Sequence, residues 1–239
     1  MLSKNQIKQL TRLKQKKYRQ QDGLFIAEGI KTIQELLNST LILQQLYTVT
    51  TFGLDADKET IIDEKDLKKI SALTTPNQAL AVFEIPTIET HSETGLILAL
   101  DDVRDPGNLG TIIRLCDWFG ITQLVCSEQT VDCYNPKVIQ ATMGSITRVQ
   151  VSYTNLNSYL SESVLPIYGA FMDGQNVYKE KLLPEGVLVM GNEANGISEN
   201  IEKRITKRIS IPRFGEIQAA ESLNVATATA ILLSEFRRS

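Results

Sequence analysis

The chain has 239 residues, of which 42% are apolar and 22% charged, enough to bury the core of one or two globular domains. Its longest apolar runs fall far short of the roughly 18 to 20 residues that cross a bilayer, so no membrane segment is predicted. The N-terminus lacks the apolar stretch of a secretory signal, and the three cysteines form no CxxC pair. We therefore expect a cytoplasmic protein without a zinc or redox motif.

His91 is the only histidine of the sequence and lies in a polar stretch. Serine and cysteine hydrolases, and histidine-rich metal sites, all need an imidazole at the reacting centre. The composition therefore argues against these kinds of chemistry, and we expect no metal site.

The net charge of -3 hides an asymmetry along the chain. Residues 1–21 carry seven basic side chains and no acidic one, whereas the rest of the chain carries 18 basic and 28 acidic ones. Apolar residues recur at near-helical spacing within this segment, which predicts an amphipathic helix with a cationic outer face. A solvated, frayed N-terminus is the alternative. The candidates for contacts to nucleic-acid phosphates are Lys4, Lys8, Arg12, Lys14, Lys16, Lys17 and Arg19.

The next part of the chain has the pattern of a small α/β unit. Periodicity predicts a helix over 30–37, strands over 43–49 and 79–85, and a charged helix over 66–72.

A polar stretch with few apolar residues follows this unit and is interpreted as a linker. The expected division is a first domain over 1–88, a linker over 89–95 and a second domain over 96–239.

In the second domain, short and continuously apolar stretches alternate with helical ones, which indicates a parallel sheet covered by helices on both faces. The last helix is expected over 219–236. Ligands of such sheets bind beyond the carboxyl ends of the strands. The residues that follow Leu100, Ala170, Met190 and Ile211 are therefore candidates for a site. The expected strands are 96–100, 123–126, 147–151, 166–171, 187–190 and 208–211.

The first candidate motif runs from Asp101 to Gly110, through the end of a strand and a Pro-Gly turn. Asn108 is expected to cap the helix that follows. Arg114 lies among apolar neighbours on that helix, where a buried guanidinium needs an anion or hydrogen-bond acceptors. A functional role and a buried ion pair both satisfy this need. The glycine spacing matches neither a dinucleotide fingerprint nor a P-loop, which disfavours a nucleotide-dependent enzyme.

Two further motifs follow later strands. Gly191 to Ser198 offers Glu193 in a turn, and Ser222 is the expected N-cap of the last helix. NxGxxxR, GNExxGIS and IP...SLNVA occur in the order and approximate spacing of three motifs of one family. The sequence resembles the SpoU (TrmH-like) RNA 2'-O-ribose methyltransferases of the SPOUT superfamily.

The likeness covers nearly the whole chain. Tyr18-Arg19, Phe25 to Gly29 and Gln78 to Val82 resemble the family's ribosomal-protein-like (L30e/L7Ae-like) α/β RNA-binding domain. The resemblance implies a C-terminal parallel sheet with a deep trefoil knot, and a homodimer that completes the active site. One departure is that the stretch from Ile211 to Leu223 is about three residues longer than usual in the family.

The resemblance also implies the activity, which is methylation of a ribose 2'-hydroxyl in structured RNA by S-adenosylmethionine, with ribosomal RNA favoured over transfer RNA. Two alternatives stay open, a non-catalytic RNA-binding protein and a base-nitrogen RNA methyltransferase. Arg114 would bind phosphate and stabilise the developing alkoxide. The implied catalytic residues are Arg114, Asn108, Glu193, Ser222 and Asn224. The implied cofactor-binding residues are Ala170, Gly191, Asn192, Glu193, Ile211 and Leu223.

Overall fold

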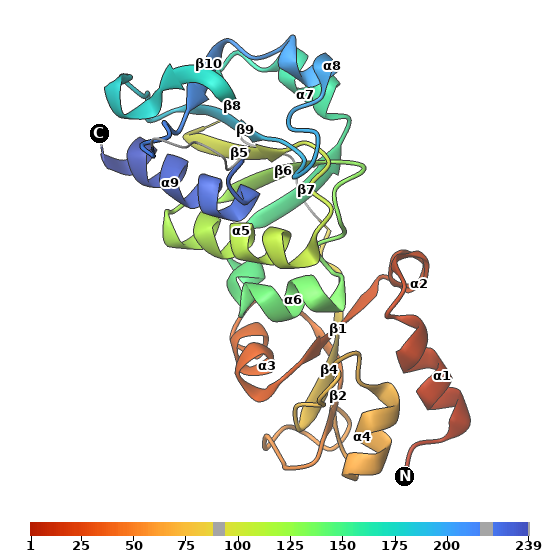
Figure 1. Ribbon diagram of the computed structural model, residues 1–239. Coiled ribbons are helices and arrows are strands. Elements are labelled where there is room, and N and C mark those ends of the chain that lie inside the picture. Colours follow the sequence, from red (N-terminus) through yellow and green to blue (C-terminus); the bar gives the residue numbers. More distant parts are fainter. Residues whose placement is uncertain (88–93, 216–221, 239) are drawn as a thin grey trace. The chain divides into compact units, whose positions relative to one another are not determined.

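The computed structural model of the protein describes residues 1–87, 94–215 and 222–238, and its chain divides into two compact units (Figure 1). Unit 1 comprises Met1–Thr87 and Asp132–Thr147. Unit 2 comprises Ile88–Val131 and Arg148–Ser239.

Unit 1 is built on a four-stranded sheet in the order β1-β4-β2-β3. β4 runs antiparallel to β1 and β2, and β3 is parallel to β2. The predicted helix over 30–37 is confirmed, and the two predicted strands each end one residue early. The elements are α1 (Lys4–Arg12), α2 (Lys16–Asp22), β1 (Leu24–Glu28), α3 (Ile30–Leu37), β2 (Leu43–Thr48), β3 (Glu59–Ile61), α4 (Glu64–Ile70), β4 (Ala79–Glu84) and α6 (Pro136–Thr142).

Both faces of this sheet are buried at β1 and β4, which explains why these two strands are strongly apolar. Successive side chains of a strand point to opposite faces. Phe25 of β1 therefore packs with Ile33 and Leu36 of α3, while its neighbour Ile26 packs on the other face with Leu10 of α1. The basic N-terminal helix is thus part of the core of unit 1.

The segment Asp132–Thr147 packs with unit 1, although in sequence it separates two strands of the other sheet. Its helix α6 contacts β1, and Ile139 belongs to the same cluster as Phe25. Asn135 caps α6 by accepting a hydrogen bond from the Lys137 amide at 2.9 Å. The expected linker over 89–95 stays a prediction. The expected division of the chain did not place residues 132–147 in the first domain.

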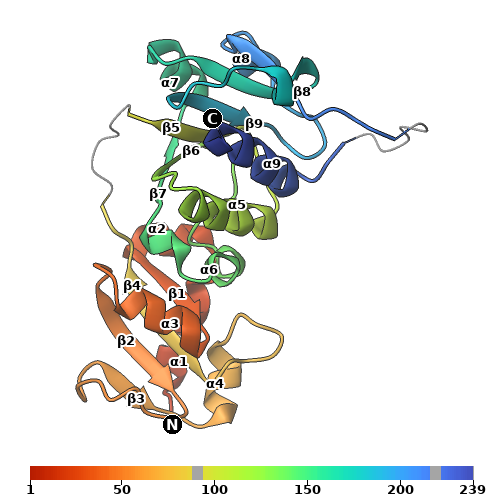
Figure 2. The same cartoon turned by 90° about the vertical axis from the view of Figure 1, so that its left-hand side faces the viewer.

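Unit 2 contains a six-stranded sheet in the order β10-β8-β9-β5-β6-β7, in which every neighbouring pair is parallel. The predicted parallel sheet with helices on both faces is confirmed. α5 and α9 lie side by side on one face, and α7 and α8 cover the other (Figures 1 and 2). The elements are β5 (Leu96–Leu100), α5 (Pro106–Trp118), β6 (Gln123–Ser127), β7 (Gln150–Thr154), α7 (Leu156–Glu162), β8 (Ile167–Asn176), β9 (Gly186–Met190), α8 (Glu199–Glu202), β10 (Lys207–Ser210) and α9 (Val225–Arg238).

Three predicted elements of the second sheet and its helices differ from the prediction, and one of them is the strand expected over 166–171, which is β8 and continues to Asn176. The strand expected over 147–151 is β7, which begins three residues later because Ser145–Thr147 forms a turn of 3-10 helix after Gly144. The last helix, expected from residue 219, begins at Val225. The part of that prediction that falls on 219–221 lies outside the described residues, as does His91.

No helix among the described residues is long and apolar enough to cross a membrane.

Candidate active site

Three side chains from three distant motifs meet at the carboxyl edge of the unit 2 sheet. The side-chain Nδ2 of Asn224 donates to Oδ1 of Asn108 at 2.9 Å, and Nδ2 of Asn108 donates to Oε1 of Glu193 at 2.9 Å. Asn224 in turn accepts hydrogen bonds from the Ala226 and Thr227 amides at the start of α9. The result is a directional chain of hydrogen bonds from the N-terminus of a helix to a carboxylate.

This chain corrects two predicted caps. Asp105, not Asn108, caps α5 by accepting from the Asn108 amide at 2.8 Å, with Pro106 in the first turn. Asn224, not Ser222, accepts from the first amides of α9. The physical reason is the same in both cases, since a cap must lie just before the first helical turn, and each helix begins at a different residue from the one predicted. With the caps assigned in this way, the side-chain amide of Asn108 is free to donate to Glu193.

The turn that carries Glu193 is held by its neighbour Asn192. Nδ2 of Asn192 donates to the Asp102 carbonyl at 2.6 Å, and its Oδ1 accepts from the Ala194 and Asn195 amides. Its backbone exchanges two hydrogen bonds of 2.9 Å with Gly196. Because all its polar groups are used within the protein, Asn192 shapes the turn. Its place in the cofactor site stays a prediction that these contacts do not favour.

A glycine is required at position 191 because the backbone of Gly196 passes very close to it. A Cβ atom at Gly191 would lie 2.2 Å from the carbonyl carbon of Gly196, a distance that no side chain tolerates. The turn therefore folds tightly against the end of β9.

The two aspartates after β5 tie the first two motifs together, Asp101 through its carboxylate and Asp102 through its backbone carbonyl, a role that was not predicted for them. Oδ2 of buried Asp101 accepts from the Ser198 amide at 2.7 Å. Asp102 has a φ of 59°, which is unusual for a residue other than glycine and turns its carbonyl toward Asn192. Their sequence signal was their place directly after a buried strand.

Arg104 lies beside this turn and was also not singled out from the sequence. It forms a bidentate pair with the Asp102 carboxylate, with both N–O distances 2.8 Å. The hydrogen bond to Asp102 raises the pKa of Arg104 above its ordinary value, and Glu193 adds to this effect at longer range. Arg104 thus places a positive charge near the carboxylate of Glu193.

Arg114 lies on the exposed side of α5, which overturns the reasoning that singled it out. Helix α5 buries Leu109, Ile112, Ile113 and Cys116, whereas the Arg114 side chain faces solvent, so no buried charge needs compensation. The structure gives Arg114 no hydrogen bond or ion pair among the described residues. Six residues separate it from Asn108, which is about 120° around a helix. The hydrogen-bonded chain therefore does not include Arg114.

One of the other predicted residues, Ala170, lies where the sheet opens. β8 pairs with β9 only through Ile167 to Gly169, so the two strands part at Ala170. The pairing of β8 with β10 then jumps from Gly169 to Gln175 in a single step of β10. Residues 170–174 consequently bulge out at the carboxyl edge. Ala170, Gly191 and Ile211 are half-buried, and the Leu223 side chain is 49% exposed.

Arg208 of β10 holds this bulge and is a second residue that the sequence reasoning missed. Its guanidinium carbon lies 3.6 Å from the ring centroid of Phe171, and it forms ion pairs with Asp173 and Glu202. The hydrogen bond from Arg208 holds the pKa of Asp173 below its ordinary value. No sequence signal distinguished Arg208 from other cations, because the bulge that it fills was not predicted.

Only part of the predicted RNA-binding set is exposed. Arg19 is buried and paired with Asp132, Arg12 pairs with Asp22 at 2.8 Å, and Nζ of Lys14 donates to the Ser71 carbonyl at 2.6 Å. Lys4, Lys8, Lys16 and Lys17 are exposed.

Comparison with known proteins identifies the family of the chain. Residues 95–234 match the SpoU rRNA methylase family, and residues 4–81 match the MRM3-like substrate binding domain. The chain belongs to the SpoU rRNA methylase family.

Members of this family resemble the chain over its full length. The chain is 31% identical over 245 residues to the 23S rRNA (guanosine(2553)-2'-O)-methyltransferase RlmP of Bacillus subtilis, covering 98% of this chain and 97% of that protein. A solved TrmH-family structure from Porphyromonas gingivalis has 41% identity and a TM-score of 0.90, covering 100% and 99% of the two chains. An rRNA methyltransferase from Sinorhizobium meliloti, solved with S-adenosylmethionine bound, has 28% identity and a TM-score of 0.86, covering 100% and 97%.

Proposed function

We propose that this protein methylates a ribose 2'-hydroxyl of ribosomal RNA, with S-adenosylmethionine as the methyl donor. The observation that carries the proposal is the hydrogen-bonded chain from Asn224 through Asn108 to Glu193, which joins all three family motifs at the carboxyl edge of the sheet. An intact network of this kind argues against a non-catalytic RNA-binding protein. The full-length relative RlmP is a ribose methyltransferase, which argues against base-nitrogen methylation.

The residues at the opening of the sheet fit S-adenosylmethionine. Separation of β8 from β9 at Ala170 exposes backbone groups at a half-buried edge, and Gly191 brings the backbone of the next loop close. We infer that Ala170, Gly191, Ile211 and Leu223 would hold the cofactor. Glu193 forms no ion pair among the residues that the structure describes, so its carboxylate is free to complement a positively charged ligand. When bound, S-adenosylmethionine supplies a methyl group activated by a sulfonium.

The protein's own residues must then orient the ribose and favour loss of the hydroxyl proton, because a ribose hydroxyl is a very weak acid. We assign this role to Arg114, whose guanidinium would bind the neighbouring phosphate and stabilise the developing alkoxide. Asn108, Glu193, Ser222 and Asn224 would position the substrate and the cofactor. Ser222 is exposed and lies two residues before the cap of α9, within reach of a bound ligand.

We propose a homodimer because Arg114 is not joined to the hydrogen-bonded chain within one subunit. Thr111, Arg114 and Trp118 are all exposed and recur along one stripe of α5, and the Trp118 side chain is 84% exposed. A second copy that covers this stripe would bury the tryptophan and could bring Arg114 to a site of the partner subunit.

Finer features of the fold also belong to the proposal. We propose that the C-terminal chain forms a trefoil knot, supported by the full-length likeness to a family structure. We interpret unit 1 as a ribosomal-protein-like domain that binds the RNA substrate, supported by its match over residues 4–81. A cytoplasmic location would suit the three free cysteines.

Mapping 2'-O-methyl groups in total RNA from a deletion strain and from wild type tests the proposal. The expected result is loss of one ribosomal RNA methylation, restored by the wild-type gene and not by Arg114→Ala. Purified Arg114→Ala should bind S-adenosylmethionine normally but transfer methyl groups ~100- to 1000-fold more slowly. An unchanged methylation map, together with no binding of S-adenosylmethionine by calorimetry at millimolar concentration, would contradict the function.

A further inference from the structure

Two aromatic rings meet on the surface of unit 2, on segments that follow neighbouring strands. Tyr178 lies in the 3-10 turn Val177–Lys179 after β8, and Phe214 lies on the segment that leaves β10. Their ring centroids are 6.4 Å apart with an angle of 33° between the planes. Tyr178 is 39% exposed and Phe214 is 83% exposed.

Exposure of such a pair needs an explanation, because phenylalanine and tyrosine normally bury most of their surface. In the described part of unit 2, the large exposed aromatic side chains are Trp118, Tyr178 and Phe214, and two of these three contact each other. Phe214 also belongs to the stretch between Ile211 and Leu223 that, from the sequence, we expect to be longer than usual in the family.

The Tyr178 side of the pair is anchored to the sheet. Oδ1 of Asn176 accepts from the Tyr178 amide at 3.0 Å, and Val177 beside it is buried. A ring on a fixed turn loses little conformational entropy when a flat ligand stacks on it.

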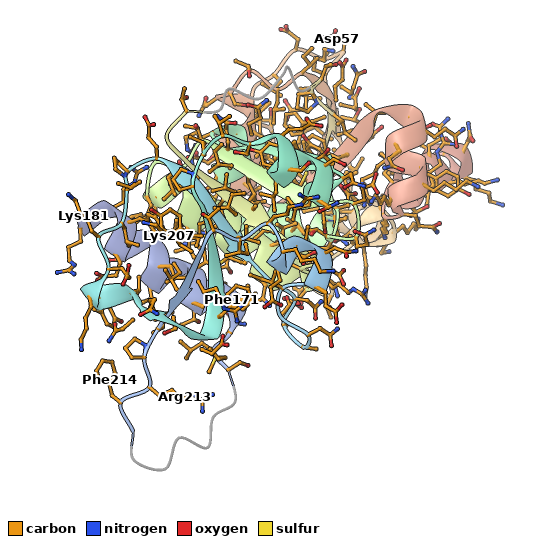
Figure 3. The ribbon with its side chains drawn as sticks, turned by 90° about the horizontal axis from the view of Figure 1, so that it is seen from above. Asp57, Phe171, Lys181, Lys207, Arg213 and Phe214 are labelled. Atoms are coloured by element: carbon orange, nitrogen blue, oxygen red, sulfur yellow. The ribbon has the colours of Figure 1, made fainter. Side chains whose placement is uncertain are left out.

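Three cationic residues lie close in sequence to the two rings. Lys179 and Lys181 are exposed and have no ion-pair partner among the described residues, and Arg213 directly precedes Phe214. Figure 3 shows Arg213 and Phe214 next to each other on the segment after β10, outside the sheet. Glu180 is the acidic residue within this group, so positive charge is in excess.

We propose that Tyr178 and Phe214 form a stacking platform for an unpaired base of the substrate RNA, with Lys179, Lys181 and Arg213 binding the adjacent phosphates. Every base has a face that stacks on an aromatic ring, and cations beside the ring attract the backbone. A protein partner is a poorer match, because lysine is depleted at protein interfaces. The inference rests on the proposed function, since it assumes that the substrate is RNA.

The test measures binding of an RNA oligonucleotide that carries 2-aminopurine, either single-stranded or annealed to its complement. Phe214→Ala should weaken single-strand binding roughly 5- to 150-fold, the equivalent of one lost base-stacking contact, and abolish the quenching of 2-aminopurine emission. Phe214→Trp should preserve both. Duplex affinity should change much less. Val164→Ala, which removes an equally exposed apolar side chain elsewhere in unit 2, is the matched control and should bind like wild type.

Three results would overturn the inference. If Phe214→Ala binds the single strand as tightly as wild type does, stacking is excluded. If Phe214→Ala loses equal affinity for the single strand and the duplex, recognition of an unpaired base is excluded. A loss of S-adenosylmethionine affinity with unchanged RNA affinity would place Phe214 over the cofactor instead. If wild type binds RNA and the variant is unaffected, this inference alone fails, whereas a wild type without any RNA affinity contradicts the proposed function as well.

Discussion

Arg19 and Asp132 form an ion pair that joins two segments of unit 1 separated by 113 residues. Nε of Arg19 donates to Oδ2 of Asp132 at 2.9 Å, and a second guanidinium nitrogen contacts the same oxygen. Nη1 of Arg19 also donates to the Leu13 carbonyl at 2.9 Å. Arg19 thus connects both N-terminal helices to the segment that carries α6, and its side chain is not available to RNA.

We predict that Arg19→Ala destabilises unit 1 by ~3 to 5 kcal/mol, because it leaves Asp132 without its buried partner. Hydrogen exchange of peptides from β1 and β4 would measure the change in unit 1. Hydrogen exchange of peptides from β5 and β9 would report on unit 2 in the same sample. Lys17→Ala, a change at an exposed cation of α2, should alter stability by less than ~0.5 kcal/mol. Equal protection of β1 and β4 from hydrogen exchange in Arg19→Ala and Lys17→Ala would show that the pair of Arg19 with Asp132 is not important for stability.

The exposed lysines of α1 are the better candidates for RNA contacts. Deletion of residues 1–21 would not test them, since Leu2, Leu10 and Leu13 are core residues of unit 1. We predict that Lys4→Gln combined with Lys8→Gln reduces the salt dependence of RNA binding, lowering the slope of log Kd against log salt by about 1.4 to 1.8. Lys65→Gln combined with Lys68→Gln on α4 makes the same charge change. Equal slopes for the two double variants would argue against RNA contacts by α1.

Periodicity in the sequence predicted all six strands of the unit 2 sheet, because those strands are buried on both faces, but only β2 and β4 of the four strands in unit 1. It placed β7 three residues early, because the apolar run does not reveal that Gly144 starts a 3-10 turn. It also missed that the chain leaves unit 2 after Val131 and that residues 132–147 pack on β1 of unit 1. That excursion depends on contacts such as Arg19 with Asp132, which no local pattern encodes.

The candidate site shows the same division. The structure brings Asn108, Glu193 and Asn224 into contact at the carboxyl edge of the sheet, the edge where the sequence placed the candidate site. Arg114 was selected for a wrong physical reason, because an apolar neighbourhood in sequence is not burial on a helix with one exposed side. The roles of Asn192 and Arg208 depend on the shapes of a turn and a bulge, which sequence spacing does not specify.

The hydrogen-bonded chain predicts the effect of a nearly isosteric change at Asn108. In Asn108→Asp, the new carboxylate still accepts from Asn224 but cannot donate to Glu193, and it places a second negative charge beside that carboxylate. We expect methyl transfer to slow by roughly 10- to 100-fold, the equivalent of a lost hydrogen bond to a charged group. Single-turnover methylation measures the rate. Asn195→Asp in the exposed part of the turn is the control, and equal rates in the two variants would argue against the role of the chain.

Asp66 of α4 gives unit 1 a predictable response to acid. Hydrogen bonds from Lys69 and from the Leu2 amide hold the pKa of Asp66 below its ordinary value. Its stabilising contribution is therefore complete above the unfolded value of about 3.9 and is lost as the pH falls through the lower folded value. We expect wild type to lose stability more steeply than Asp66→Asn below about pH 4, as measured by urea unfolding. Parallel pH profiles, with Glu64→Gln as the control, would contradict this assignment.

Arg208 offers the sharpest test of how the sheet opening binds its ligand. Its guanidinium packs on the ring of Phe171 and pairs with Asp173, so it supports both ends of the bulge that follows Ala170. In Arg208→Ala the bulge loses a cation–π contact and two exposed ion pairs, contributions of about 0.5 to 2 kcal/mol in all.

We therefore expect Arg208→Ala to raise the Kd for S-adenosylmethionine by roughly 3- to 30-fold in calorimetry, with RNA affinity unchanged. Arg208→Lys should lie between the variant and wild type, because an ammonium retains the charge but cannot form the same planar contacts. Arg204→Ala is the matched control, since Arg204 donates to Asn157 on α7 rather than to the bulge. If Arg204→Ala and Arg208→Ala weaken the cofactor equally, the effect is a general loss of charge, and the bulge is not what positions the ligand.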